Sequence, residues 1–391
     1  MDPARSPYSP GAGAPPLVIS GRDGELAAWQ TALQRIASGR PARGLVLHGL
    51  RGVGKTVLLG AMRDEAVRRE WLVASMEVGA FSGGFLAHLG EALYPSLRRL
   101  ARPGIGTRLK RALATFAALN VKVDASGAWT FGLDLEPGAP ATGTLELDLV
   151  TLISDLAEAM QEQRAGVAVL VDEMQDLDAQ TLAALCAVAH HCAQRGLPFL
   201  LCGAGLPSLP RVLSEAKTYA ERLFEYRSIG PLLPDDATRA LVAPAAIEGV
   251  RWEPAALEWV LEAAGGYPFF LQEMGQMTWQ VARGPDVITL ADAREGVAEG
   301  RRQLDFGFFL SRWERATTAE RAYLEAMARD GDGPSPSKDV AERLGRSLSS
   351  VGPTRAGLIS KGLIFAPEHG RVAFTVPGMA DFITRRQEVW E

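Results

Sequence analysis

Cysteine is scarce in this chain of 391 residues, and no long apolar run interrupts it. The three cysteines, Cys186, Cys192 and Cys202, lie in apolar helical or strand patterns, which predict buried thiols in a reducing compartment rather than a disulfide framework. No apolar stretch is long enough to span a bilayer, and residues 1–16 lack the apolar core of a signal peptide. We therefore expect a cytoplasmic protein without a membrane partner.

An excess of positive charge is also missing. The formal net charge of -5 argues against a protein coated with nucleic acid over its whole surface, although a local basic face remains possible. A zinc site is not indicated either. His190, His191 and Cys192 are consecutive rather than one helical turn apart, so they cannot share one face of a helix. What remains is the composition of a globular protein, with a length typical of two or three domains.

A glycine-rich loop is the strongest motif. Gly49-Leu50-Arg51-Gly52-Val53-Gly54-Lys55-Thr56 follows a short apolar run that predicts a strand and precedes the apolar start of a helix. Such glycines let backbone amides surround an anion at a helix N-terminus, while Lys55 reaches the β- and γ-phosphates and Thr56 binds Mg²⁺. The motif predicts a nucleoside triphosphate site formed by Gly49, Gly52, Val53, Gly54, Lys55, Thr56 and Val57.

Two carboxylates follow a second apolar run. Residues 167–171 are continuously hydrophobic, which is typical of a central parallel strand covered on both faces. Asp172 and Glu173 come directly after it, at the edge of the sheet where ligands of open α/β folds bind. We expect Asp172 to hold Mg²⁺ and Glu173 to polarise the attacking water.

The chain divides into four segments. Residues 1–16 contain five prolines and predict a disordered leader. Residues 17–232 form the nucleotide-binding core, with an insertion at 97–144 that includes a β-hairpin around Ala125-Ser126-Gly127. Residues 233–312 predict a helical lid domain. Residues 313–391 predict three short helices and a β-hairpin, which is a winged helix.

Basic residues concentrate in two of these segments. In the predicted winged helix, residues 346–376 contain four basic residues and a single acidic one, Glu368. The basic residues are Arg346, Arg355, Lys361 and Arg371, and this excess of positive charge predicts binding to double-stranded DNA. Because winged helices also bind proteins, an unknown protein partner remains an alternative. The basic run at 98–111 is either a solvated helical face or a further nucleic-acid or partner contact.

From Gly21 to about Arg386 the chain resembles a bacterial group of AAA+ ATPases related to the origin-recognition ATPases. These neighbour the switch ATPases known as signal-transduction ATPases with numerous domains. The segments that carry the resemblance are the phosphate loop and residues 21–25, 171–175, 203–207, 219–224, 266–272 and 355–362.

The resemblance implies an α/β P-loop NTPase with a parallel five-stranded sheet, a helical lid and a C-terminal winged helix. It also implies a cofactor pair of ATP and Mg²⁺, with Ile19 and Arg22 on the adenine side. Pro268 would help hold the lid against the nucleotide. Arg222 would reach the γ-phosphate of a neighbouring subunit, a role that Arg227 or Arg211 could also fill.

Two departures from the family bear on turnover. The polar sensor at the end of the fourth strand is replaced by Gly203-Ala204, and the arginine sensor of the lid is replaced by Gly266-Tyr267-Pro268. Both favour slow hydrolysis or a switch controlled by the nucleotide state. We expect an ATPase that forms ADP and phosphate, becomes a homo-oligomer when ATP is bound, and controls assembly on DNA or a partner protein. The alternatives are a signalling or defence scaffold whose winged helix binds protein, and a transposition or helicase-loading regulator.

Overall fold

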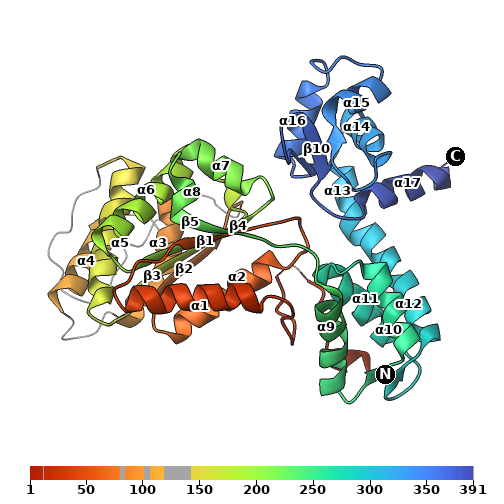
Figure 1. The fold of residues 1–391 in the computed structure, drawn as a ribbon, viewed down its shortest axis with the longest axis horizontal. Coiled ribbons are helices and arrows are strands. Elements are labelled where there is room, and N and C mark those ends of the chain that lie inside the picture. The colour runs from red at the N-terminus through yellow and green to blue at the C-terminus, as the bar shows by residue number, and fades with distance from the viewer. Residues whose placement is uncertain (12, 80–83, 101–105, 119–141, 391) are drawn as a thin grey trace, which may run out of the picture.

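The structure is a computed structural model that describes residues 1–11, 13–79, 84–100, 106–118 and 142–390. The hairpin predicted within the insertion lies outside these residues. Figure 1 shows an α/β unit on one side, with a helical lid and a C-terminal module stacked beside it.

A five-stranded parallel sheet forms the centre of the α/β unit, in the order β2-β3-β4-β1-β5. The strands are β1 (Gly44–His48), β2 (Leu72–Glu77), β3 (Val167–Asp172), β4 (Phe199–Gly205) and β5 (Phe224–Ser228). This confirms the predicted α/β P-loop fold. Only β4 separates β1 from β3, so the phosphate loop after β1 and the acidic pair at the end of β3 share one edge of the sheet.

Helices cover both faces of this sheet (Figure 1). On one side lie α1 (Asp23–Ala37) and α2 (Lys55–Arg68), and on the other α5 (Leu145–Gln161) and α6 (Ala179–Arg195). The remaining helices of the unit are α3 (Phe85–Leu100), α4 (Thr107–Ala118), α7 (Leu209–Ala216) and α8 (Ala220–Leu223). In the basic run, Arg108 pairs with Glu162 and Arg111 with Asp155, so part of that charge is neutralised by α5 and the residue after it.

The lid consists of four helices, each of which begins with proline at its first position or with a side-chain cap. They are α9 (Pro234–Ile247), α10 (Pro254–Ala264), α11 (Pro268–Val281) and α12 (Leu290–Gln303), with the short strands β6 (Arg251–Trp252) and β7 (Val287–Ile288). A π-helix, η3 (Leu304–Phe309), and the short α13 (Leu310–Glu314) lead out of the lid.

The C-terminal module combines three helices with a small antiparallel sheet. Its three helices are α14 (Thr318–Ala328), α15 (Ser337–Arg343) and α16 (Gly352–Ser360). Its antiparallel sheet has the order β8-β10-β9, with β8 (Ser335–Pro336), β9 (Ile364–Phe365) and β10 (Arg371–Phe374). A last helix, α17 (Met379–Trp390), was not predicted; it packs against α14.

The buried apolar residues form two large clusters. The first surrounds the parallel sheet, from Trp29 to Ile229. The second runs from Leu232 to Ile383 and joins the lid to the C-terminal module without a break. The chain passes from one core to the other between Ile229 and Leu232.

The N-terminal segment differs from the disordered leader that its proline content predicts. Tyr8 is buried in the second core, its hydroxyl donates to the Leu241 carbonyl at 2.7 Å, and the indole of Trp252 donates to it at 3.1 Å. Trp279 also packs edge-on against its ring. The segment cannot build a core of its own, but a single aromatic side chain is enough to anchor it in the core of the lid.

Candidate nucleotide site

A cavity of about 530 Å³ lies between the α/β unit and the second core. This volume is in the range of small-molecule sites. Most of its lining comes from the N-terminal segment, the phosphate loop with the acidic pair, the start of α11, and the stretch from η3 to α13. Glu77, Leu232 and Ala240 complete it. Of the predicted nucleotide ligands, the cavity brings together Ile19, Arg22, Gly52, Val53, Gly54, Lys55, Thr56, Val57 and Pro268.

The phosphate loop has the backbone that an anion cradle requires. Gly52 and Gly54 adopt left-handed conformations, with φ of 84° and 90°, which side chains with a Cβ rarely accept. Helix α2 begins at Lys55, so its N-terminus points into the loop. Gly49 does not line the cavity. A Cβ there would lie 2.0 Å from the Ile229 carbonyl, so this glycine allows the close approach of two backbones.

Lys55 is folded back onto the loop. Its side chain is only 7% exposed, and Nζ donates to the Gly49 and Leu50 carbonyls at 2.9 and 2.8 Å. Burial lowers the pKa of Lys55 to about 8, although the nearby charges of Glu173 and Asp172 partly raise it. Phosphate oxygens would stabilise this buried ammonium better than the two carbonyls do.

The two predicted magnesium ligands meet. Thr56 Oγ1 donates to Asp172 Oδ2 at 2.6 Å, and burial raises the pKa of Asp172. Among the described residues no three His, Cys, Asp or Glu side chains cluster to hold a metal. A hydroxyl and one carboxylate nevertheless fit Mg²⁺, which keeps several waters and shares its remaining positions with nucleotide phosphates. Bound there, Mg²⁺ would neutralise charge on the phosphates.

Glu173 is held from two sides. It has a left-handed backbone with φ of 50°, and its carboxylate accepts a hydrogen bond from Gln175 Nε2 at 2.7 Å. Gln175 Oε1 in turn accepts from the Leu206 amide, just beyond β4. Gln175 thus connects the end of β4 to Glu173, the residue expected to act as the base. The other carboxylate oxygen of Glu173 lies 3.4 Å from Arg51 Nη2 of the phosphate loop.

The lid closes on the phosphate loop through backbone contacts. The Phe269 amide donates to the Gly52 carbonyl at 3.2 Å, and Pro268 lies beside Gly54. Arg22 Nη2 also donates to the carbonyls of Val53 and Gly230, at 3.1 and 2.6 Å. Arg22 therefore links the loop to the segment where the chain enters the lid.

The C-terminal module also contacts the phosphate loop. The Arg51 amide donates to the Thr375 carbonyl at 2.9 Å. Next to this bond, Leu206, Phe365 and Ala373 form a small apolar cluster, against which Leu50 packs. Arg51 therefore touches the C-terminal module with its backbone and Glu173 with its side chain.

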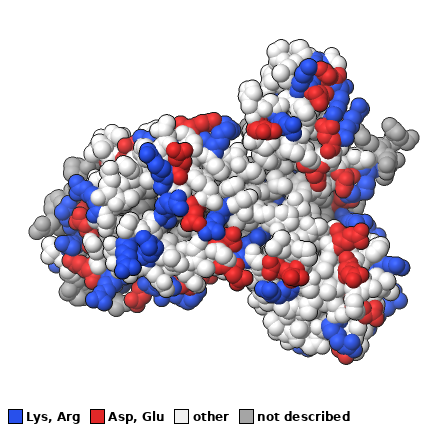
Figure 2. Space-filling model, in the orientation of Figure 1, with Lys and Arg blue, Asp and Glu red and all other residues white. Residues whose placement is uncertain are grey.

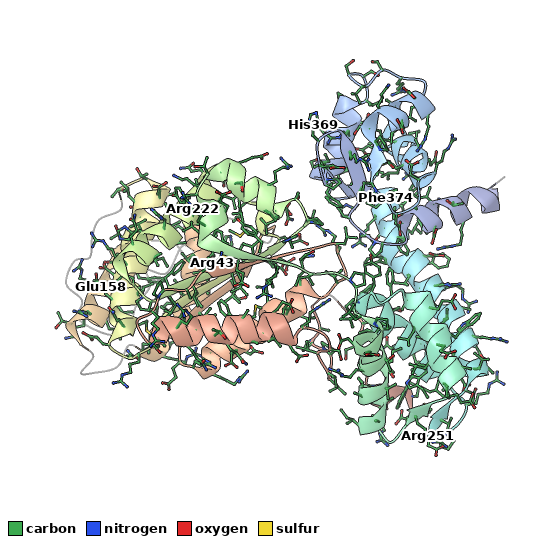
Figure 3. The ribbon with its side chains drawn as sticks, viewed as in Figure 1. Arg43, Glu158, Arg222, Arg251, His369 and Phe374 are labelled. Atoms are coloured by element: carbon green, nitrogen blue, oxygen red, sulfur yellow. The ribbon has the colours of Figure 1, made fainter. Side chains whose placement is uncertain are left out.

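Arg222 does not belong to this site. It is exposed on α8 and lines a separate cavity of about 950 Å³ together with Arg43 and Arg227. Figure 3 places Arg43 and Arg222 within the α/β unit. The two cavities share no lining residue, so in this arrangement Arg222 does not reach the phosphate loop of its own chain.

The four basic residues predicted to bind DNA differ in their surroundings. Lys361 Nζ lies 2.6 Å from Glu320 Oε2, and Arg371 Nε lies 3.0 Å from Glu368. Arg355 is half-buried, and its Nε has no hydrogen-bond partner. Arg346 is exposed after α15. On the face that Figure 2 shows, basic and acidic side chains are mixed over the C-terminal module.

Several lining residues had no signal in the sequence. They are Arg51, Glu77, Glu273, Phe308, Arg312 and, in the N-terminal segment, Ser9, Pro10, Gly11, Gly13, Ala14 and Pro16. Arg51 occupies a variable position of the loop motif, and the others approach the loop only through packing of distant segments. Phe269 and Gln272 also line the cavity, and both lie in the segment 266–272 that carries the family resemblance.

None of the described helices has both the length and the apolar character that a membrane crossing requires.

Comparisons with known proteins agree with the geometry of the pocket. The model of the family described as AAA ATPase domain matches residues 19–201, and a family described as Domain of unknown function (DUF8462) matches residues 306–383. No match is found among curated proteins.

Among solved structures, the chain is similar to a Walker-type ATPase of Pyrococcus abyssi, at 18% identity, a TM-score of 0.57, and coverage of 94% of this chain and 96% of that one. Weaker similarities are to the Aeropyrum pernix ORC1 protein in complex with DNA (17% identity, TM-score 0.45, 96% and 95% coverage) and to the RuvB Holliday junction branch migration motor of Thermotoga maritima (14%, 0.45, 90% and 92%).

At 18% identity, the similarity to the Walker-type ATPase of Pyrococcus abyssi supports the fold of this chain and nothing more. The family match covers the phosphate loop and the acidic pair, the same residues that the structure brings to one edge of the sheet. Residues 19–201 are thus similar to the family described as AAA ATPase domain, and their fold is that of a P-loop ATPase core.

Proposed function

We propose that this protein is a Mg²⁺-dependent ATPase that works as a switch controlled by its nucleotide state. The observation that carries the proposal is the position of Arg51. One residue of the phosphate loop pairs with the expected base, Glu173, and also hydrogen-bonds the C-terminal module at Thr375. A phosphate group that draws the Arg51 guanidinium away from Glu173 would therefore disturb the docking contact as well.

The switch requires that ATP and ADP favour different positions of the C-terminal module, since a ligand shifts only an equilibrium whose states it binds unequally. In the arrangement described here the β9–β10 sheet is docked on Leu50 and Arg51. We infer that ATP releases this contact and exposes the module to its partner, whereas ADP leaves it docked.

Hydrogen exchange tests this directly. With ADP, the Arg51 amide and residues 363–376 should remain protected. With a non-hydrolysable ATP analogue and Mg²⁺, both should exchange faster, while the β3 amides of the sheet stay unchanged. Equal protection in the two states would refute the switch but leave nucleotide binding intact.

The partner class remains a proposal. DNA is what the basic residues of the module predict, but the ion pairs of Lys361 and Arg371 neutralise two of the four charges and favour a protein partner. Salt dependence separates the two, because phosphate contacts release counterions and weaken steeply as salt rises. Light-scattering mass with ADP or the ATP analogue, with and without duplex DNA, tests whether ATP also drives homo-oligomers in which Arg222 reaches a neighbour.

The segment boundaries also remain our proposal: residues 17–232 for the core, 233–312 for the lid and 313–391 for the module. The change of hydrophobic core between Ile229 and Leu232 supports the first boundary.

A further inference from the structure

We propose that Arg312, at the joint between the lid and the C-terminal module, is a ligand of the terminal phosphate of ATP and lets the protein distinguish ATP from ADP. This inference rests on the proposed function and names a positively charged residue that the family resemblance does not assign.

Arg312 lies in the right cavity. It lines the same space as the phosphate loop, Asp172 and Glu173, although it belongs to α13. Phe308, one helical turn earlier, lines the cavity too, so the two side chains share one face. Phe308 lies in the π-helix η3 and Arg312 follows it in α13, and π-helical turns are frequent at functional sites.

Phe308 holds the Arg312 side chain in place. The guanidinium carbon lies 3.9 Å from the centre of the Phe308 ring, and Nη1 donates to the Phe308 carbonyl at 2.7 Å. The Phe308 ring packs 4.9 Å from Phe269, whose amide donates to the Gly52 carbonyl of the phosphate loop. A continuous series of contacts therefore positions Arg312 relative to the loop, which leaves Nε and Nη2 for a ligand.

The charge of Arg312 has no counter-ion among the described residues. No carboxylate of these residues forms an ion pair with it, and the charged groups that act on it most are two further cations, Arg51 and Arg315. Burial and these cations lower the pKa of Arg312 to about 10. Glu173, one of the carboxylates that line the same cavity, already pairs with Arg51. A half-buried, unpaired guanidinium is unfavourable, and an anion in the cavity would remove this penalty.

The terminal phosphate is the group best placed to supply that anion. The loop amides would hold the β-phosphate and Lys55 would reach both the β- and the γ-phosphate, whereas Arg51 and Glu173 mark the end where water attacks. Arg312 lines the cavity together with Arg51 and Glu173, and we assign it to this second end. ADP has no phosphate there. Since α13 leads directly into the C-terminal module, a contact to Arg312 would also act on the element that the switch must move.

The test compares nucleotide affinities of the full chain, measured by calorimetry for ADP and for a non-hydrolysable ATP analogue with Mg²⁺. The variants are Arg312→Gln, Arg312→Lys and a matched control, Arg301→Gln, which removes an exposed arginine of α12 outside the cavity. We expect Arg312→Gln to lose about 10- to 100-fold for the ATP analogue, as for a lost charge-assisted hydrogen bond, and less than about 3-fold for ADP. Arg312→Lys should recover part of the loss, and Arg301→Gln should match the wild type.

Two results would overturn the inference. An Arg312→Gln variant that keeps the wild-type ratio of the two affinities would show that Arg312 does not contact the terminal phosphate. An equal loss for both nucleotides would assign it a packing role. If the wild type itself binds neither nucleotide, the result refutes the proposed ATPase function rather than the role of Arg312 alone. Retained ADP affinity in Arg312→Gln shows at the same time that this variant is folded.

Discussion

The two hydrophobic cores are built in different ways. The first is assembled around one parallel sheet from a nearly continuous part of the chain, residues 29–229. The second is assembled from three segments: the lid, the C-terminal module and Tyr8 of the N-terminal segment. Aromatic contacts connect the lid to the C-terminal module within this core. The ring centre of Phe309 lies 6.3 Å from that of Phe270 in the lid and 5.4 Å from that of Phe382 in α17, on which it stacks.

This difference indicates where the molecule can move. Packed cores transmit rigid displacements, so the lid and the C-terminal module should shift together, and bending should concentrate between Ile229 and Leu232, where the chain leaves the first core. The nucleotide cavity lies between the two cores and takes its ligands from both. The first core supplies the phosphate loop and the acidic pair, and the second supplies Pro268, Phe269 and Arg312.

The largest expected effect comes from the ligands on the first core. Lys55→Ala removes the buried ammonium and should weaken ATP binding by at least about 100-fold, the loss expected for charge-assisted hydrogen bonds to phosphate. Calorimetric titration measures it, with Lys338→Ala, an exposed lysine of α15, as the control. Tight ATP binding by Lys55→Ala would show that the cavity is not the nucleotide site.

Glu173→Gln should separate chemistry from binding. A general base contributes about 10²- to 10⁴-fold, so the hydrolysis rate should fall by at least about 100-fold while ATP affinity stays within about 3-fold. Phosphate release measures the rate. Gln175→Ala should give a smaller loss, because it leaves the carboxylate but removes one of its two supports. Unchanged hydrolysis in Glu173→Gln would place the base elsewhere.

Tyr8→Ala tests whether the N-terminal segment is part of the second core. Removing a buried aromatic ring should lower the free energy of unfolding of the second core by about 3 kcal/mol, whereas Tyr8→Phe, which loses only the hydroxyl and its bonds to Leu241 and Trp252, should lower it by about 1 kcal/mol. Denaturant unfolding followed by tryptophan fluorescence measures both. A Tyr8→Ala variant as stable as the wild type would mean that the segment is disordered in solution, as its composition predicts.

The smallest effect is expected on the C-terminal module. If the module binds DNA, Arg346→Ala should weaken binding several-fold and lower the salt slope by about 1. Lys361→Ala should change DNA affinity less, because this lysine pairs with Glu320. Its expected effect is instead a modest loss of stability at the start of α14, where Glu320 completes a capping box. Equal losses of DNA affinity in both variants would contradict the ion pair.

Much of the site nearest the sheet could be predicted because it depends on consecutive residues. A glycine-rich loop between a strand and a helix has one workable backbone path, so the motif predicts where Lys55 and Thr56 point. The acidic pair follows an apolar strand of a parallel sheet, and parallel strands present their carboxyl ends at one edge. The bond from Thr56 to Asp172 confirms this juxtaposition.

Composition carries less information about contacts between distant segments. Proline content predicts a disordered N-terminal segment. Tyr8 of this segment, however, packs against Trp252 and Trp279, which lie more than 200 positions away in the chain. The count of basic residues predicts a DNA-binding face. That count does not include Glu320, which lies in an earlier helix and neutralises Lys361 only after folding.

The sequence by itself determined the nucleotide-binding fold, the phosphate loop and the identity of the acidic pair, because each depends on local spacing and on the direction of one strand. Only the tertiary structure decided that the lid and the C-terminal module share a core, that Arg51 connects Glu173 to Thr375, and that Arg312 faces the nucleotide cavity. These contacts join residues far apart in the chain. They depend on how two cores pack against each other, and no periodicity or motif within a single segment encodes that packing.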